Sequence, residues 1–431
     1  MHTVDHVEEA SMPGQPHVAV VGAGIGGLTL ALELHAAGIG CQVFEAAPAL
    51  GTVGVGINLL PHATRELARV GLEAKLGEVG VATRESVFFN RFGQLIYAEP
   101  AGRYAGYGWP QFSIHRGDLH AVLLEAVAER LGPDGVVLGR RCRRVEQDGR
   151  GATVIFDEPT EDGAGGPAPP VRASVVVGCD GIHSTVRRQL HPEEGPPRYS
   201  GVNMWRGVTR WPPFLTGASM VRVGWLATGK LVLYPVRDAD ARGRQLVNWV
   251  AEIETPHHRT RDWNRPGDLA DFLPAVEDWH FDWLDVPALL HASEVVLEYP
   301  MVDQDPLERW SFGRVTLLGD AAHPMVPRGS NGAGQAIVDA RVLADCLAEQ
   351  SDPAQALEAY ESARLEATAS VVRMNRTNPP DAILREVYLR TGDRPFASID
   401  DVISADELAA LSDNYKTVAG YAKDSLGHPH G

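Results

Sequence analysis

The segment Gly22-Ala23-Gly24-Ile25-Gly26-Gly27 constrains the fold most, because it stands between an apolar run at 17–21 and a helical run at 28–37. One glycine lets a strand turn sharply, a second lets backbone approach a pyrophosphate, and a third lets the helix pack closely on the sheet. Glu45 closes the next apolar run, where a carboxylate accepts the hydroxyls of an adenosine ribose. The pattern predicts a strand–helix–strand unit that binds an adenine dinucleotide.

The composition excludes several classes of partner. The chain has 431 residues, of which 39 are basic and 56 acidic, giving a formal net charge of −17. This charge argues against binding to nucleic acid or to an anionic membrane surface. No apolar run is long enough to span a membrane without a glycine or a charge. We expect small-molecule partners and a monomer or homodimer, with local cations wherever an anionic ligand binds.

The four cysteines, Cys41, Cys142, Cys179 and Cys346, are scattered and form no Cys-x-x-Cys pair or Cys/His cluster. They are typical of reduced thiols rather than of a disulfide framework or a zinc site, so we expect no metal site and a cytoplasmic protein.

Two kinds of segment alternate along the chain. Strand and helix patterns of the dinucleotide-binding type occupy 17–85, 112–185 and 305–375, whereas 86–111 and 186–304 carry alternating apolar residues and most of the tryptophans. We therefore expect an α/β fold in which a Rossmann-like domain is interleaved with a β-sheet domain that forms the substrate site.

The remaining segments are predicted more coarsely. Residues 1–16 are polar and expected to be disordered, and 376–431 are expected to form a C-terminal helical segment and a tail. Periodicity and turn residues predict helices near 61–70, 120–131 and 335–375, and a hairpin of 143–157 with 171–177 across a Gly/Pro-rich turn at 159–170.

Two aspartates follow apolar strands at the edge where open α/β sheets bind ligands. Asp180 lies in Gly178-Cys179-Asp180-Gly181, after the run at 173–177, and Asp320 lies in Gly319-Asp320-Ala321-Ala322-His323-Pro324, after 315–318. Each alone could cap a helix or form a turn. Both together, with Arg116 in Ile114-His115-Arg116-Gly117-Asp118-Leu119, are far more specific.

These motifs, in this order, resemble the group A (single-component) FAD-dependent aromatic monooxygenases, the para-hydroxybenzoate hydroxylase superfamily, over about residues 17–375. Within it the chain is most similar to the pyocyanin-forming phenazine monooxygenases. That closer similarity rests on Gly54-Val55-Gly56-Ile57-Asn58, Met204-Trp205-Arg206-Gly207-Val208, Tyr299-Pro300-Met301-Val302-Asp303 and the segment from Gly329 to Ile337.

The resemblance implies FAD as the cofactor and a role for each motif. Asp320 would bond a ribityl hydroxyl, Asp180 would lie close to the cofactor and take part in the use of NAD(P)H, and Arg116 would contact the phosphates or ribityl chain. The amides of Gly332, Ala333 and Gly334 would face the pyrimidine edge of the flavin, where helix-start N–H groups stabilise the reduced anion. The other expected FAD contacts are Gly22, Gly24, Ile25, Gly26, Gly27, Glu45, Ala46, Val55 and Gly56.

The resemblance also implies the reaction. NAD(P)H reduces FAD, O2 adds at C4a to give a hydroperoxide, and an electron-rich aromatic ring attacks its distal oxygen. The β-rich domain must exclude water from this site. Since no second dinucleotide-binding unit follows, NADH or NADPH is expected to dock transiently as a co-substrate. We expect hydroxylation of a carboxylated aromatic compound, such as a phenazine, in secondary metabolism.

Pro327 and Arg328 are the candidate catalytic residues. Pro327 stands where the family places a proline against the flavin ring, and Arg328 is a departure from the residue expected in the phenazine enzymes. Arg328 could form a surface ion pair, brace the loop, hold the charge of reduced flavin, or bind a substrate carboxylate with two parallel bonds. The motif histidines, His115, His183 and His323, are expected to pack or cap rather than act as bases.

Two alternatives stay open at this point. Flavin-dependent halogenases share the fold, but Trp279-His280-Phe281-Asp282-Trp283 does not match their Trp-x-Trp-x-Ile-Pro signature. A non-catalytic Rossmann-like binding protein would not need the loop around Pro327. The tryptophans Trp205, Trp211, Trp225 and Trp249 are more often core residues than a substrate platform, and His257-His258 is expected in a solvated turn.

Overall fold

The computed structural model of the chain describes residues 18–51, 54–157, 168–255 and 265–427. The expected disordered segment 1–16, most of the turn at 159–170 and His257-His258 lie outside these ranges.

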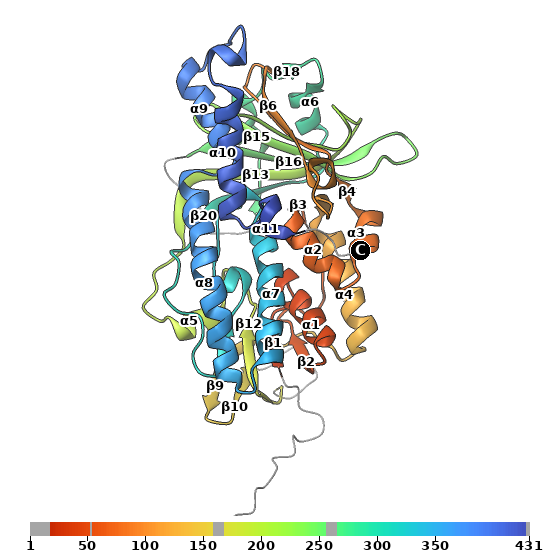
Figure 1. Cartoon of the computed structure of the whole chain (residues 1–431). Helices are drawn as coiled ribbons and strands as arrows, with labels where there is room; N and C mark the ends of the chain where they lie inside the picture. The colour runs from red at the N-terminus through yellow and green to blue at the C-terminus, as the bar shows by residue number, and fades with distance from the viewer. Residues whose placement is uncertain (1–17, 52–53, 158–167, 256–264, 428–431) are drawn as a thin grey trace, which may run out of the picture.

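A five-stranded parallel sheet forms the half of the molecule that contains the first glycine motif (Figure 1). Its strands are short, and the two central ones, which are rich in valine, are buried on both faces, as a parallel sheet covered by helices requires. The strand order is β21 (Val315–Leu317), β12 (Val175–Gly178), β1 (Val18–Val21), β2 (Cys41–Phe44) and β8 (Val136–Val137). The helices of this half are α1 (Ile25–Ala36), α2 (Pro61–Arg69), α3 (Glu73–Val79), α4 (Arg116–Leu131), α5 (Thr185–Leu190) and α7 (Gly332–Glu349).

An eight-stranded sheet forms the other half. Its order is β17 (Arg265–Pro266), β20 (Val296–Asp303), β13 (Arg198–Trp211), β16 (Gln245–Glu254), β15 (Gly229–Arg237), β14 (Ser219–Trp225), β5 (Glu85–Phe89) and β6 (Leu95–Pro100). Trp205 and Trp249 are buried on one face with residues of α6 (Val286–His291) and Phe272, so these two tryptophans are core residues. The opposite face, here called the inner face, is buried with Val326 of the parallel-sheet half and carries Met204, Met220, Val232, Tyr234 and Met301.

Smaller sheets complete both halves. β3 (Gly56–Leu59), β7 (Phe112–His115) and β4 (Val81–Ala82) form one, and β9 (Cys142–Asp148), β10 (Gly151–Phe156) and β11 (Val171–Ala173) form another. Gly56 docks against the large sheet: its N–H donates to Asn248 Oδ1 over 2.6 Å, and a Cβ there would lie 2.6 Å from Asn248 and Tyr234 atoms. The predicted hairpin partner at 171–177 is wrong in its second part, because the chain changes sheets at Ser174 and β12 enters the parallel sheet.

Two predicted helix boundaries are also wrong. The helix expected at 120–131 begins at Arg116, because the His115 side chain caps it by accepting from the Gly117 amide. The helical run expected over 335–375 divides into α7 and α8 (Pro353–Thr377), since Asp352 caps a new helix that has a proline in its first turn.

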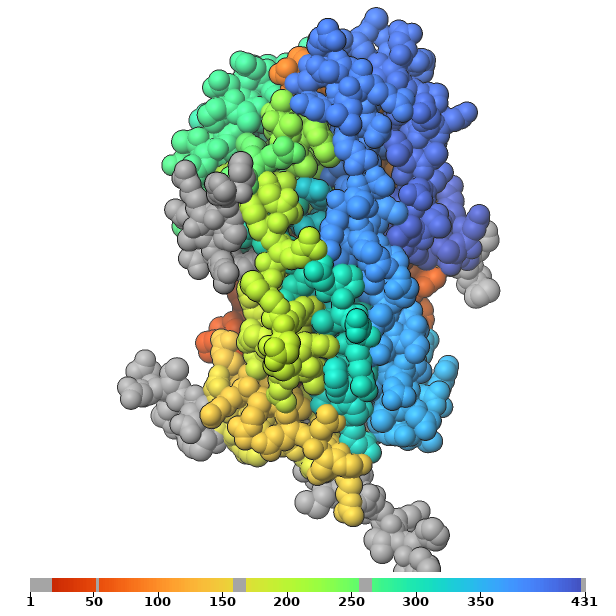
Figure 2. All heavy atoms as spheres, turned by 90° about the vertical axis from the view of Figure 1, so that its left-hand side faces the viewer, coloured from red at the N-terminus to blue at the C-terminus, as the bar shows by residue number. Residues whose placement is uncertain are grey.

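The helices after α7 run along one side of the molecule and cover both halves. They are α8, α9 (Ala382–Thr391), α10 (Ala405–Val418) and α11 (Lys423–Leu426). Figure 2 shows them as a continuous band from the parallel-sheet half to the top of the eight-stranded sheet. Within the described residues, no helix is both long and apolar enough to cross a membrane.

Candidate functional site

Four strand ends meet at one edge of the parallel sheet, here called the cofactor edge. The Gly22 amide donates to Phe44 O over 2.8 Å, and the Cys179 amide donates to Val21 O over 2.7 Å. The Leu318 amide donates to Gly178 O over 2.9 Å. Glu45, Asp180 and Asp320 follow the neighbouring strands, so the fold brings the glycine motif and all three carboxylates to the same edge.

The glycine motif is shaped by close backbone approach. Gly22 has φ of +108°, which disfavours a side chain, and a Cβ there would lie 2.5 Å from Cys179 O. A Cβ at Gly27 would lie 2.0 Å from Gly22 O, and one at Gly26 would lie 2.8 Å from Leu318 Cδ2. At Gly24 nothing lies within 4 Å, so the backbone there is open to a ligand. This is the space a pyrophosphate needs at the start of α1.

The Glu45 carboxylate is held by backbone amides. Its Oε2 accepts from Ala23 N and its Oε1 from Ala47 N, each over 2.8 Å, with Ala46 between them in sequence. Two fixed N–H donors orient the carboxylate beside the glycine turn, where the ribose hydroxyls of a dinucleotide would bind.

The loop before α4 brings Val55 and Arg116 together. The Arg116 amide donates to Val55 O over 3.0 Å, and His115 Nε2 lies 2.8 Å from Gly54 O. His115 is therefore a capping residue. The Arg116 side chain is exposed and has no hydrogen bond or ion pair within the described ranges, which leaves its guanidinium available to a phosphate.

Asp180 serves the start of α5. Its carboxylate accepts from Ser184 Oγ over 2.5 Å and from the Thr185 amide over 2.7 Å. Burial raises the pKa of Asp180 above its ordinary value, against these hydrogen bonds. The carboxyl therefore lies at the cofactor edge while its oxygens hold the turn that leads into α5.

Sequence reasoning assigned no role to Arg187, which lies seven residues after Asp180. This side chain is 2% exposed, and its Nη1 donates to Ala321 O and Ala322 O over 2.9 and 2.8 Å. Glu194 pairs with the same guanidinium at 2.5 Å. Arg187 thus joins the two aspartate motifs. Its fixed spacing from Asp180 was the available signal, but its partners are backbone carbonyls that no side-chain pattern reveals.

Asp320 and the start of α7 point to one place. Asp320 is exposed, and a Cβ on Gly332 would lie 3.7 Å from its Oδ1. The first amides of α7, at Gly332, Ala333 and Gly334, have no acceptor within the helix and carry its positive end. A carboxylate beside free N–H groups can hold a polyhydroxyl chain and an electron-rich ring edge at once.

A buried ion-pair cluster supports this place from behind and was also missed from the sequence. Asp339 accepts from Arg364 Nε over 2.7 Å, from the Gly319 amide over 3.2 Å, and lies 2.5 Å from His323 Nε2. Although burial opposes it, His323 and Arg364 hold the pKa of Asp339 below its ordinary value. His323 is therefore a structural hydrogen-bond partner of Asp339.

Pro327 and Arg328 lie in the loop between the Asp320 motif and α7. Val326 is buried against the inner face, Pro327 is exposed and Arg328 is partly buried. The buried Arg328 Nε has no hydrogen-bond partner, and no ion pair of this guanidinium occurs in the described part of the chain. The surface ion pair considered for Arg328 therefore has no contact to support it.

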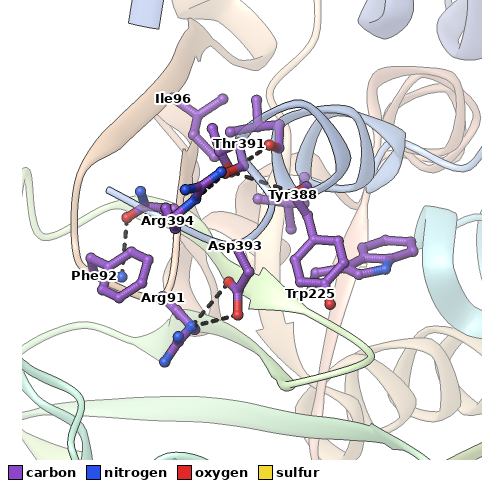
Figure 3. Close-up of a pocket in the computed structure, with 12 residues that line it drawn as sticks. Arg91, Phe92, Ile96, Trp225, Tyr388, Thr391, Asp393 and Arg394 are labelled. Carbon is purple, nitrogen blue, oxygen red and sulfur yellow. Dashed lines mark hydrogen bonds and ion pairs between the residues drawn. The ribbon is translucent and has the colours of Figure 1, made fainter. Parts of the chain in front are cut away.

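A separate pocket lies where α9 meets the β5–β6 turn and β14 (Figure 3). Arg91 Nε is 2.9 Å from Asp393 Oδ2 there, and Trp225 and Tyr388 line its wall. None of the cofactor-edge residues lines this pocket. Over the described ranges, no group of three or more His, Cys, Asp or Glu side chains could hold a metal ion.

The sequence matches the FAD binding domain family over residues 15–375. It is 42% identical over 409 residues to the phenazine 1,6-dicarboxylic acid hydroxylase PhzS of Lysobacter antibioticus, covering 94% of this chain and 97% of that protein. The 6-hydroxynicotinate 3-monooxygenase of Bordetella bronchiseptica is 31% identical, with coverages of 89% and 94%.

Among solved structures, HpxO of Klebsiella pneumoniae in complex with FAD and uric acid has a similar fold, with a TM-score of 0.73 at 23% identity. The match covers 96% of this chain and 98% of that one. These relatives are hydroxylases, so neither a halogenase nor a non-catalytic binding protein is favoured. The chain belongs to the FAD binding domain family, and it is an FAD-dependent aromatic monooxygenase that uses NAD(P)H and O2.

Proposed function

We propose that the enzyme hydroxylates a carboxylated aromatic compound of the phenazine class and that Arg328 binds the substrate carboxylate. The observation that carries this proposal is the unpartnered Nε of Arg328 beside Pro327. A guanidinium matches a carboxylate with two parallel hydrogen bonds. The chain has a net charge of −17 and repels an anionic substrate at long range, so a local cation such as Arg328 is needed to attract the carboxylate.

The inner face gives the ring its apolar surroundings. Met204, Met220 and Val232 are buried there with Val326, directly before Pro327. Methionine side chains adapt to irregular ring shapes and contact aromatic edges favourably. An apolar wall and one cation together favour a flat aromatic acid.

The relatives support the same substrate class. PhzS is named for phenazine 1,6-dicarboxylic acid, and the 3-amino-4-hydroxybenzoate 2-monooxygenases of Streptomyces platensis, which are 36% identical to this chain, are named for another aromatic acid.

We propose the cofactor contacts as follows. Glu45 binds the adenosine ribose, Gly24 admits the pyrophosphate and Arg116 neutralises it, while Asp320 binds the ribityl chain and the α7 amides face the pyrimidine edge. Bound FAD supplies the redox chemistry, from hydride acceptance to oxygen transfer. Pro327 covers the ring, Asp180 lies near it, and the protein supplies orientation and water exclusion. The remaining proposed contacts come from Gly22, Ile25, Gly26, Gly27, Ala46, Val55 and Gly56.

The substrate proposal is tested with Arg328→Met. We expect KM for a phenazine carboxylic acid to rise about tenfold or more, because a charged hydrogen-bonding pair is lost, while KM for the uncharged parent ring changes little. Arg242→Met, at an exposed turn, is the matched control. An equal rise in KM for both compounds would contradict the carboxylate role and leave the flavin or loop role for Arg328.

We further propose a cytoplasmic enzyme, on the basis that no disulfide joins Cys41, Cys142, Cys179 and Cys346 in the structure. It acts as a monomer or homodimer, which light scattering coupled to size-exclusion chromatography would distinguish.

A further inference from the structure

Helix α10 connects the eight-stranded sheet with the loop that carries Pro327. On the sheet side, Lys416 Nζ lies 2.8 Å from Glu99 Oε2, and Ser412 Oγ donates to Glu99 over 2.8 Å. Glu99 belongs to β6, the edge strand of the eight-stranded sheet, so these contacts attach α10 to that edge.

Tyr415 carries the contact with the loop Val326–Asn331. The Tyr415 hydroxyl donates to Asn375 Oδ1 over 2.6 Å and accepts from Asn331 Nδ2 over 2.9 Å. The side-chain amides of these two asparagines also bind the loop backbone. Asn331 Nδ2 donates to Gly329 O over 3.0 Å, and Asn375 Nδ2 donates to Val326 O over 3.2 Å. Both ends of the loop therefore depend on one phenolic hydroxyl.

The loop has been shaped around this tyrosine. A Cβ on Gly329 would lie 1.5 Å from the Tyr415 hydroxyl oxygen, so no other residue fits there without displacing the ring. Tyr415 is 1% exposed, and both Asn331 and Asn375 are buried. Water cannot replace the hydroxyl without opening this contact.

A second connection follows one turn later. Gln335 Nε2 donates to Ala419 O over 2.9 Å, and Arg364 Nη2 donates to Gln335 Oε1 over 2.6 Å. Arg364 also binds Asp339, whose other oxygen accepts from the Gly319 amide of the Asp320 motif. The chain after α10 is thus hydrogen-bonded, through three side chains, to the cofactor edge.

The segment beyond α10 covers the first turn of α7. Tyr421 stacks on His62 with ring centroids 5.5 Å apart and an interplanar angle of 16°. His62 is 2% exposed, and its Nε2 would lie 2.7 Å from a Cβ on Gly334. The aromatic pair therefore closes the side of α7 that faces α2.

We infer that Tyr415 is a positioning residue for the hydroxylation, whose hydroxyl holds the 326–331 loop in the shape that excludes water from the flavin. This inference rests on the proposed place of Pro327 against the flavin ring, and not on the substrate class. Without the hydroxyl, two buried amides lose a partner and the loop gains freedom. Water then reaches the site, and one NAD(P)H and one proton reduce O2 to hydrogen peroxide without product.

Tyr415→Phe tests the inference, because it keeps the ring, which is buried in one cluster with Val371 and Ala419, and removes only the hydroxyl. Tyr360→Phe is the matched control: Tyr360 is 0% exposed and its hydroxyl donates to one carbonyl, Leu317 O, over 3.1 Å. Amide hydrogen exchange of the peptide 324–335 is measured on FAD-loaded protein without substrate. The peroxide formed per NAD(P)H oxidised is measured with substrate.

In Tyr415→Phe we expect exchange in 324–335 to accelerate at least tenfold and the peroxide share to rise severalfold, with neither change in Tyr360→Phe. If Tyr415→Phe does not fold, Asn375→Leu removes the acceptor of the same hydroxyl and should act in the same direction. Unchanged exchange and coupling, or equal changes in both tyrosine variants, would overturn the inference. The Arg328 test, a ratio of KM values, is independent of this outcome.

Discussion

The two large sheets carry their polar groups in different ways. At the cofactor edge, glycines and backbone amides form most of the surface open to a ligand, and Glu45, Asp180 and Asp320 lie just after the ends of strands. On the inner face of the eight-stranded sheet, charged side chains lie within the sheet itself. Lys230 contacts Glu252 at 3.0 Å and also Asp381, while Arg222 Nε lies 3.2 Å from the same aspartate.

Because of this difference, the two regions should respond differently to the loss of one side chain. A strand-end site depends on backbone shape and can lose one side chain without losing the fold. In a buried ionic cluster the charges are removed from water, so the protein loses stability when any one charge loses its partners. We therefore expect substitutions in the cluster to act on stability and substitutions at the cofactor edge to act on FAD affinity.

The largest effect should come from Lys230→Met. It leaves Asp381 and Glu252 buried beside a single cation, Arg222, and breaking such a group costs about 3–5 kcal/mol. The free energy of unfolding from denaturant titration measures it. Lys75→Met, in an exposed pair with Glu129, is the control. A loss below about 1 kcal/mol for Lys230→Met would remove the contrast between the two sheets.

The next largest effect should come from Glu33, a buried residue of α1 in the parallel-sheet half, whose carboxyl has no hydrogen-bond partner among the described residues. Burial raises its pKa to about 7. Folding therefore favours the protonated form, whose stabilising contribution is complete below the unfolded pKa and is lost as the pH rises from about 4.5 to 7. Glu33→Gln should remove this loss and unfold at a higher temperature than the native protein at pH 8.

The gain at pH 8 should not exceed about 3.5 kcal/mol, since the pKa rises from 4.5 to about 7 and one pKa unit corresponds to about 1.4 kcal/mol. Arg341 Nη1, at 3.8 Å, offsets part of the burial. Parallel stability profiles of the two proteins between pH 5 and 8 would show that Glu33 does not titrate in this range. Glu358→Gln, on an exposed face of α8, controls for the lost charge.

Asp320→Ala should act on the cofactor and spare the fold. A hydrogen bond to a carboxylate contributes about 1.5–3 kcal/mol, so the Kd for FAD should rise about tenfold or more. Quenching of flavin fluorescence by the apoprotein measures it. Asp134→Ala, at an exposed turn, should leave it unchanged. Full flavin occupancy in Asp320→Ala at limiting FAD would show that Asp320 does not bind the cofactor.

The smallest effect should come from the rim between the halves. Arg237 of β15 binds Asp118 of α4 through two contacts of 2.6 Å, but the arginine side chain is 44% exposed. Exposed pairs contribute about 0.2–1 kcal/mol, so Arg237→Met should lower the free energy of unfolding by that amount, and less in high salt. A loss of about 2 kcal/mol or more would show that the Arg237–Asp118 pair contributes substantially to the stability of the contact between the two halves.

The sequence allowed the cofactor edge to be predicted because its chemistry is local. Gly22, Glu45, Asp180 and Asp320 each follow an apolar run closely, and their spacing to that run carries the information. The roles proposed for the FAD-contacting residues and for Pro327 and Arg328, and the domain boundaries, stay predictions.

The supporting contacts could not be predicted, because they join distant residues through groups that leave no pattern. Arg187 reaches a carbonyl 134 residues away, and Asn331 meets Tyr415 across 84 residues. Arg222 stands between Val221 and Val223, as a solvent-facing residue of a strand would, and Lys230 stands at the start of β15, yet both are buried. Asp381, at the start of a helix in the expected C-terminal segment, compensates both buried charges by forming an ion pair with each.

The order of the parallel sheet determines when this protein can acquire its cofactor during synthesis. β1 pairs with β12 and β12 with β21, so the edge formed by residues near 22 is incomplete until the ribosome has made residues beyond 317. Contacts of such sequence separation form slowly. The edge that binds the flavin is therefore complete only after most of the chain has been synthesised.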